Sequence, residues 1–281
     1  MNARSDLPAS GSAALWSTLA AQWRLVDVPL RPCPEDVRAY EILVGAWQAA
    51  HAGKPARGLL LGVTAEIATM SWPAGSTLVA VDHSFPMTAK VWPKPAHGAV
   101  VCADWRAMPL GRGDCDIALG DGCLTLLRWP EGYRAFAREV RATLADDGLL
   151  ALRCFCRPRS AESPEQVFAD LRSRRIGSFH AFKWRLAMAL HGTLEEGVRL
   201  ADIWECWAAE IRDADALARH CGWPEFLVRS MELYRGSSTV YRFPTPGEAA
   251  DALAPEFLLE SQRSGSYELA ERCPILVFRP R

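Results

Sequence analysis

Four places in the sequence put a glycine or an aspartate at the end of a short apolar run. Gly62 follows the first run, Asp82 ends the second, Asp104 and Trp105 close the third, and Gly120-Asp121-Gly122 ends the fourth. Carboxylates accept hydrogen bonds from hydroxyl and amine groups, and glycine lets the backbone approach a ligand closely. The pattern therefore indicates one polar ligand site built from several strand ends.

A parallel sheet is the element that would bring these residues together. The apolar runs are bounded by turn residues and alternate with helical patterns, so they predict buried strands in an α/β, three-layer, Rossmann-like sheet. In such a sheet, ligands bind beyond the carboxyl ends of the strands, where the strand order reverses. The predicted strands are 58–62, 77–82, 98–102, 116–119 and 148–155, and the helices between them begin after Thr64 and cover 84–91 and 130–144.

Helical segments flank this sheet in the sequence. Residues 1–50 contain two amphipathic patterns separated by a proline-rich break, with the second helix starting near residue 34, and we expect an N-terminal helical cap. The strand pattern stops after residue 157 and returns at 238–281, where runs at 257–261 and 274–278 predict an antiparallel hairpin after a helix over 246–253. The intervening residues 158–237 predict a helical lid, with helices over 164–175, 179–190 and 194–211.

The residues at the strand ends suit an adenosine. A carboxylate at Asp82 can accept from both hydroxyls of a ribose, Asp104 can accept from an exocyclic amine, and Trp105 offers a flat apolar surface to a ring. Each residue also has a simpler interpretation. The two aspartates are good helix N-caps, Trp105 is a good core residue, and Asp121 between two glycines is a good turn former.

These residues, in this order on the predicted strands, resemble the class I S-adenosylmethionine-dependent methyltransferases over about residues 40–156 and 240–281. The resemblance implies a seven-stranded sheet whose last strand is antiparallel, with S-adenosylmethionine as cofactor and S-adenosylhomocysteine as product. It assigns the methionine part to Gly62, Val63 and Thr64, the ribose to Asp82, and the adenine to Asp104 and Trp105, with His83, Ser84 and Met87 flanking the ribose and adenine. It assigns the cofactor's amino group to the Gly120-Asp121-Gly122 turn through the Gly120 carbonyl.

The glycine loop departs from the family pattern. Thr64 and Glu66 stand where the family usually has its second and third glycines, so the Thr64 hydroxyl and amide would have to hold the cofactor carboxylate. Asp82 would equally suit a dinucleotide-binding Rossmann fold. Glu66 argues against that alternative, because it puts a carboxylate where a pyrophosphate would lie.

Methyl transfer depends mainly on positioning and deprotonating the acceptor, so no fixed catalytic motif is expected. His180 and Asp121 are the candidate general bases, and the aromatic lid would shape a pocket for a small molecule with an oxygen or nitrogen nucleophile. Arg172, Arg174, Arg175, Lys183 and Arg185 form a basic run that is either a solvated face or an anion site. A protein that binds the cofactor without catalysis, in a regulatory or partner role, is the alternative function.

Composition and charge limit which binding partners and which cellular compartment we expect. A net charge of −1 and a pI of about 6.6 give no basic field for duplex nucleic acid. We expect a cytoplasmic protein, since the sequence shows neither a secretory signal nor an apolar run of about 18 residues that would span a membrane. Nine cysteines without a CxxC pair and six dispersed histidines predict free thiols and no metal centre. The sequence leaves the oligomeric state open.

Overall fold

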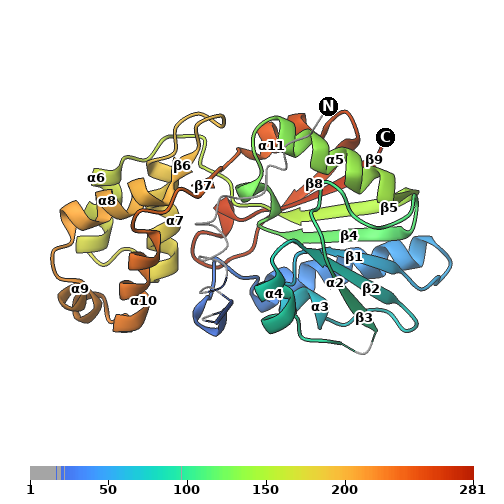
Figure 1. Ribbon diagram of the computed structural model, residues 1–281, viewed down its shortest axis with the longest axis horizontal. Helices are drawn as coiled ribbons and strands as arrows, with labels where there is room; N and C mark the ends of the chain where they lie inside the picture. The colour runs from blue at the N-terminus through green and yellow to red at the C-terminus, as the bar shows by residue number, and fades with distance from the viewer. Residues whose placement is uncertain (1–16, 18–19, 22, 96) are drawn as a thin grey trace.

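The computed structural model describes residues 17, 20–21, 23–95 and 97–281. Its centre is a seven-stranded sheet in the order β3-β2-β1-β4-β5-β9-β8 (Figure 1). The first five strands along the chain run parallel, and β9 is antiparallel to both of its neighbours. The strands are β1 Arg57–Leu61, β2 Thr77–Asp82, β3 Gly98–Cys102, β4 Cys115–Asp121, β5 Leu144–Arg153, β8 Phe257–Arg263 and β9 Ile275–Pro280.

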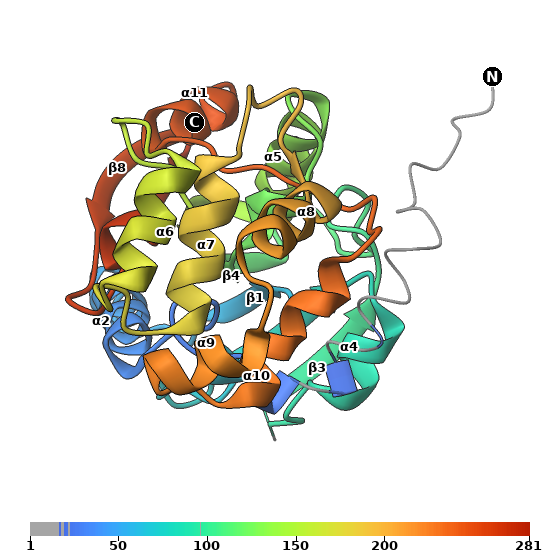
Figure 2. The same cartoon turned by 90° about the vertical axis from the view of Figure 1, so that its left-hand side faces the viewer.

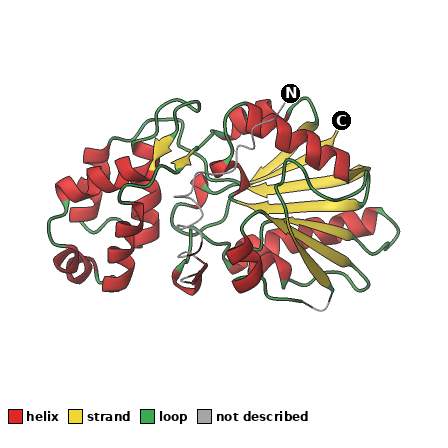
Figure 3. Cartoon of the chain, viewed as in Figure 1, coloured by secondary structure: helices red, strands yellow, loops and turns green. Residues whose placement is uncertain are grey.

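Helices cover both faces of this sheet (Figure 3). One face packs on α5 and α11, and the other on α2, α3 and α4, in two separate apolar clusters. The strong amphipathic pattern of α5 explains its place, because Tyr133, Phe136 and Val140 all project to the sheet. These helices are α2 Pro34–Ala50, α3 Ala65–Ala68, α4 Phe85–Lys90, α5 Glu131–Thr143 and α11 Pro246–Leu253, with one 3₁₀ turn, η2, at Cys123–Leu126 and another, η4, at Ala270–Arg272.

The N-terminal part has two roles. Helix α2 begins with Pro34 at its first position and lies on the sheet through buried Tyr40, Val44 and Trp47, so it belongs to the α/β layers rather than to a cap. The segment before it, residues 23–33 with η1 at Trp23–Leu25, contacts the lid where the His180 ring bonds to the Leu25 carbonyl. The first predicted helix falls mostly on residues outside the described ones.

The lid is a group of helices that lies in front of the sheet in Figure 2. Its buried apolar side chains form one cluster, which also includes Phe155, Leu269 and Cys273 of the sheet body. The predicted helix over 194–211 begins only at Leu200, because Gly197 turns the chain with a φ of +66° and Val198–Arg199 pairs with Val240–Tyr241. This small sheet carries the lid past the expected boundary at residue 237. The lid elements are α6 Pro164–Arg172, α7 Phe179–Ala189, β6 Val198–Arg199, α8 Leu200–Glu210, α9 Ala214–Cys221, α10 Glu225–Arg229, η3 Ser230–Tyr234 and β7 Val240–Tyr241.

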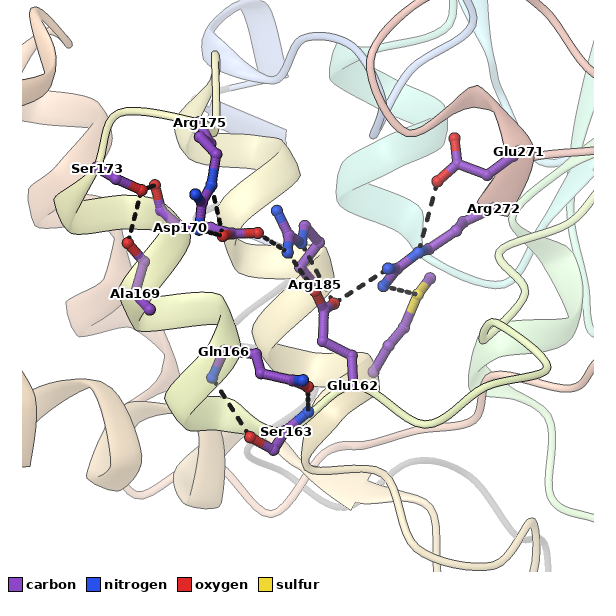
Figure 4. A network of polar contacts seen from close by, with 11 residues as sticks. Glu162, Ser163, Gln166, Ala169, Asp170, Ser173, Arg175, Arg185, Glu271 and Arg272 are labelled. Atoms are coloured by element: carbon purple, nitrogen blue, oxygen red, sulfur yellow. Dashed lines mark hydrogen bonds and ion pairs between the residues drawn. The ribbon is translucent and has the colours of Figure 1, made fainter.

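Ion pairs fasten the lid to the sheet body (Figure 4). Glu162, in the segment between β5 and α6, accepts from Arg185 on α7 and, at 3.0 Å, from Arg272 on η4 just before β9. Arg185 also pairs with Asp170 on α6 at 2.6 Å. The network therefore joins α6, α7 and the chain entering β9, and it fixes the inner face of α7 relative to the sheet.

The predicted seven-stranded α/β sheet with an antiparallel last strand is confirmed. The closing hairpin is also present, with β9 inserted between β5 and β8. All nine cysteines are free thiols. Within the described ranges, no helix combines the length and apolar character needed to cross a membrane.

Tyr40 joins α2 to the sheet by hydrogen bonds as well as by packing. Its hydroxyl donates to the carbonyl of Gly120 at 2.8 Å and accepts from the backbone N–H of Arg153 at 3.0 Å. Tyr133 is equally buried on the opposite face, but its hydroxyl has no hydrogen-bond partner among the described residues. The two tyrosines therefore form a matched pair for testing the hydrogen bonds alone.

We predict that Tyr40→Phe lowers the free energy of unfolding by about 1–3 kcal/mol, because it removes two hydrogen bonds to buried backbone groups. Tyr133→Phe should change it by less than about 0.5 kcal/mol or stabilise the protein slightly, since no bond is lost. Urea unfolding of both variants measures the difference. Equal losses in the two variants would show that the Tyr40 bonds contribute nothing.

Candidate functional site

The strand order reverses between β1 and β4, and the predicted site residues surround that point. Leu61, the last residue of β1, pairs with Val81 of β2 on one side and with Gly120 of β4 on the other. The residues that follow these positions therefore lie at one edge of the sheet. This edge is where a parallel sheet binds its ligand.

Gly62, Asp82 and Trp105 converge at this edge. Gly62 has a φ of +103°, which favours glycine, and a Cβ built on it would lie 4.0 Å from Asp82 Oδ2 and 3.8 Å from Trp105 Cζ2. The Trp105 indole N–H donates to the Val81 carbonyl at 2.5 Å, and its ring packs edge-on against Phe136. Trp105 is thus anchored to the sheet with one ring edge toward Gly62.

The Asp82 carboxylate is only partly used by the protein. Its Oδ1 accepts from the backbone N–H of Ser84 at 2.8 Å, and the His83 ring lies 3.9 Å from the same oxygen. Burial raises the pKa of Asp82 from its ordinary value. The Ser84 hydroxyl is buried and has no hydrogen-bond partner in the described chain. Asp82 Oδ2 and Ser84 Oγ together therefore offer an acceptor and a hydroxyl to a ligand.

Asp104 lies at the same edge but is held by its neighbour. Arg106 donates to the Asp104 carboxylate from its backbone N–H at 2.8 Å, from Nε at 2.9 Å and from Nη2 at 2.6 Å. This hydrogen bonding to Arg106 lowers the pKa of Asp104. The charge of His83 acts on both Asp82 and Asp104, so the three groups are close. An adenine amine would have to share Asp104 with the guanidinium.

The loop after β1 is short and mostly buried. Val63 packs in the apolar cluster under α3, as does Met87 under α4. Thr64 is the N-cap residue of α3, and its hydroxyl makes no hydrogen bond to any described residue. Glu66 accepts from Arg31 Nε at 2.7 Å, while its other oxygen is buried without a partner. Thr64 therefore has the free polar group that the glycine-poor loop requires.

The turn after β4 is shaped by its two glycines. A Cβ on Gly120 would meet Cys123 Sγ at 2.5 Å, and one on Gly122 would meet Phe155 at 2.7 Å, so neither position admits a larger residue without a shift. The Gly120 carbonyl already accepts from Tyr40, which occupies one of its two lone pairs.

Asp121 belongs to a buried network that was not predicted from the sequence. Arg153, at the end of β5 and 0% exposed, donates to Asp121 Oδ1 at 2.5 Å and to the Tyr267 hydroxyl at 3.2 Å. The same guanidinium lies 3.2 Å from Asp36 and donates to the Pro29 carbonyl. Burial raises the pKa of Asp121 to about 6, against the opposing effect of Arg153. A signal existed, since Arg153 interrupts the apolar strand 148–155.

His180 is buried on α7 and faces the N-terminal segment. Its Nε2 lies 3.1 Å from the carbonyl oxygen of Leu25, which can only accept, so Nε2 carries the proton. Nδ1 then has a lone pair, and it is buried without a partner among the described residues. Burial, together with the charge of Lys183, lowers the pKa of His180 to about 4. The ring is therefore neutral near pH 7 and able to accept a proton at Nδ1.

The two candidate bases lie on different bodies. Asp121 is on the sheet and His180 on the lid, and no hydrogen bond or ion pair within the described residues joins them. Over the same part of the chain, no three His, Cys, Asp or Glu side chains gather as metal ligands would.

The basic run of the lid does not form one surface. Arg172 pairs with Glu210, Arg175 with Asp170, and Arg185 with Glu162 and Asp170. Arg174 is exposed, whereas Lys183 is buried. The expected face of solvated cations is therefore mostly a set of ion pairs, from which Lys183 is separate.

We predict that His180 makes the protein sensitive to acid. Its pKa is about 4 when folded and about 6.5 otherwise, so between these values only the unfolded chain binds the proton and stability falls as the pH falls. The full effect is about 3 kcal/mol, at about 1.4 kcal/mol per pKa unit. In His180→Gln the stability should decline less between pH 6.5 and 4, as measured by urea unfolding. If the two proteins lost stability in parallel as the pH falls, His180 would be protonated in the folded protein. The charged groups that act on His180 are Lys183 and Asp27.

Comparisons with known proteins find relatives by structure. Neither a scan against protein-family models nor a search of curated proteins finds a match. The solved structure of the CcbJ methyltransferase from Streptomyces caelestis matches with a TM-score of 0.55 at 16% identity, covering 95% of this chain and 97% of that one. The DhpI–SAM–HEP complex matches with a TM-score of 0.52 at 14% identity, covering 96% of each chain.

A third structure, from Rhodobacter sphaeroides and assigned as a zinc-dependent alcohol dehydrogenase, gives a TM-score of 0.62 at 13% identity, covering 98% of this chain and 100% of that one. At such identities the likeness shows the fold alone. Together with the strand order β3-β2-β1-β4-β5-β9-β8, in which β9 is reversed, it gives this chain the fold of the class I S-adenosylmethionine-dependent methyltransferases.

Proposed function

We propose that this protein binds S-adenosylmethionine at the carboxyl edge of the sheet and transfers its methyl group to an oxygen or nitrogen of a small molecule. The observation that carries the proposal is the pairing of Gly62 and Asp82 at the ends of adjacent strands, with Asp82 Oδ2 facing the glycine. A carboxylate at the end of this strand is suited to accept hydrogen bonds from the two hydroxyls of a ribose. The fold supports the same assignment.

The polar atoms that lack partners fit such a cofactor. Ser84 Oγ is buried and unpartnered beside Asp82, and the Thr64 hydroxyl makes no bond in the described chain. We assign the methionine part to Gly62, Val63 and Thr64, the ribose to Asp82, His83, Ser84 and Met87, the adenine to Asp104 and Trp105, and the amino group to the turn Gly120, Asp121 and Gly122. When bound, the cofactor supplies a methyl group on a sulfonium, which an acceptor lone pair can attack.

The chain's own task is to hold the acceptor and take its proton. His180 Nδ1 is the group best suited to accept that proton, because the bond from Nε2 to Leu25 fixes the tautomer. Asp121 is the second candidate, although its pairing with Arg153 occupies one oxygen. The buried lid helix α7 excludes water from the face that carries His180.

One observation favours the alternative, a protein that binds the cofactor without catalysis. Arg153 already binds Asp121, and Tyr40 already binds the Gly120 carbonyl, so part of the sheet edge serves the fold. Tight binding of S-adenosylhomocysteine with no turnover on any acceptor would support this alternative. Release of S-adenosylhomocysteine during incubation with a pool of small metabolites would support the enzyme.

We predict that Asp82→Asn weakens S-adenosylhomocysteine binding roughly 10- to 100-fold, because it removes a charged acceptor worth about 1.5–3 kcal/mol. Isothermal titration calorimetry on ligand-free protein measures the dissociation constant. Asp251→Asn is the matched control, since Asp251 is exposed on α11 and is not one of the proposed site residues, and it should bind like the wild type. Failure of the wild type to bind would refute the proposed function.

We also predict that His180→Gln lowers kcat roughly 100- to 10,000-fold, the usual contribution of a general base. Its affinity for S-adenosylhomocysteine should stay within about twofold of the wild type, because glutamine can still donate to the Leu25 carbonyl. The assay follows S-adenosylhomocysteine release with whichever acceptor fraction supports turnover. An unchanged kcat would remove His180 from the chemistry and leave Asp121 as the candidate.

A further inference from the structure

Lys183 is a buried lysine without a counter-ion. It is 6% exposed, and no carboxylate oxygen of the described residues lies within 4.0 Å of its ammonium group. Its Nζ instead lies 5.6 Å from the centre of the Phe179 ring and 5.3 Å from that of Tyr234. Two aromatic faces only partly replace the hydration of an ammonium ion, and buried lysines are almost always paired.

Helix α7, which carries Lys183, contacts the segment that precedes α2. His180 precedes Lys183 by one turn on the same helix face and contacts the carbonyl of Leu25. The segment that contains Leu25 is held to the sheet edge by Arg153, through Pro29, and by the Arg31–Glu66 pair. The charge of Lys183 contributes to the lowered pKa of His180.

A second set of contacts ties α7 to the end of β4. Phe155 lies against Gly122, only 2.7 Å from where a Cβ on that glycine would stand. Trp184, next to Lys183, packs edge-on against Phe155 with ring centres 5.1 Å apart, and its buried Nε1 has no partner among the described residues. Through Trp184 and Phe155, helix α7 therefore contacts the turn after β4, which carries proposed cofactor-binding residues.

The neighbouring arginines, unlike Lys183, already have carboxylate partners. Arg185 on α7 is paired with Glu162 and Asp170, and Arg272 with Glu162, as Figure 4 shows. Lys183 thus stands as a single positive charge between two flat apolar rings. A phosphate dianion usually takes several cations or a helix N-terminus, whereas a carboxylate is a planar monoanion that one ammonium group can balance.

We propose that Lys183 binds a carboxylate of the methyl acceptor, so that the acceptor is an organic acid held between the rings of Phe179 and Tyr234. This inference rests on the proposed function, because it places the acceptor beside the cofactor edge. Burial lowers the pKa of Lys183 to about 8, so the group is still mostly charged near pH 7. A bound carboxylate would supply the missing counter-ion.

The experiment titrates acetate and benzoate into protein saturated with S-adenosylhomocysteine, with acetamide and benzamide as neutral analogues at the same ionic strength. Calorimetry gives the affinities for the wild type, Lys183→Met and the control Lys90→Met, whose lysine is exposed on α4. We expect saturable binding of the carboxylates to the wild type and the control, and binding roughly 10- to 100-fold weaker to Lys183→Met. The amides should not bind measurably.

Stability gives a second, independent readout. Without ligand, Lys183→Met should have a higher Tm than the wild type, because it removes an unpaired buried charge. A lower Tm would mean that the lysine has a structural counter-ion, and it would overturn the proposal. Should Lys183→Met fold poorly, Lys183→Gln keeps the length and polarity of the side chain without the charge and serves in the same titration.

The other outcomes are equally decisive. No carboxylate binding to the wild type, equal binding to Lys183→Met, or benzamide binding as well as benzoate would overturn the proposal. Loss of S-adenosylhomocysteine binding in Lys183→Met would also overturn it, since the lysine would then hold the cofactor. If the wild type itself does not bind S-adenosylhomocysteine, the proposed function fails, and the same titration on ligand-free protein still tests Lys183.

Discussion

The buried guanidinium of Arg153 is the interaction on which the arrangement around the sheet edge depends. An arginine that is 0% exposed is stable only when its charge is balanced and its donors are used. Asp36 and Asp121 balance the charge, and Tyr267 and the Pro29 carbonyl take further donors. The network thereby connects the start of α2, the ends of β4 and β5, the β8–β9 connection and the N-terminal segment.

This arrangement divides the polar groups near the edge into two sets. On the side of β4 and β5, the Asp121 carboxylate and the Gly120 carbonyl are hydrogen-bonded within the protein. Those on the side of β1 and β2, and on the inner face of the lid, include Ser84 Oγ and His180 Nδ1, which are buried without partners. Unpaired buried polar atoms cost free energy, so they mark where a ligand would stabilise the protein most.

Much of the fold follows from local patterns. Strand β2 and helix α11 have the predicted bounds, because an apolar run between turn residues and a Thr-Pro-Gly-Glu start are each decided by nearby residues. The predicted helix over 194–211 is wrong at its start, since the pairing of Val198 with Tyr241 joins segments far apart in sequence. Helices α9 and α10 were not predicted, and their short lengths give a weak periodic signal.

The order of residues along the chain is enough to predict which of them lie at the sheet edge. Parallel strands end together, so the order of apolar runs was enough to bring Gly62 and Asp82 side by side. Which of those groups are already hydrogen-bonded within the protein depends instead on how the chain folds. Arg106 binds Asp104, and Arg153 reaches back across more than a hundred residues to Pro29 and Asp36. Such pairing depends on three-dimensional distance and burial, which residue spacing does not encode.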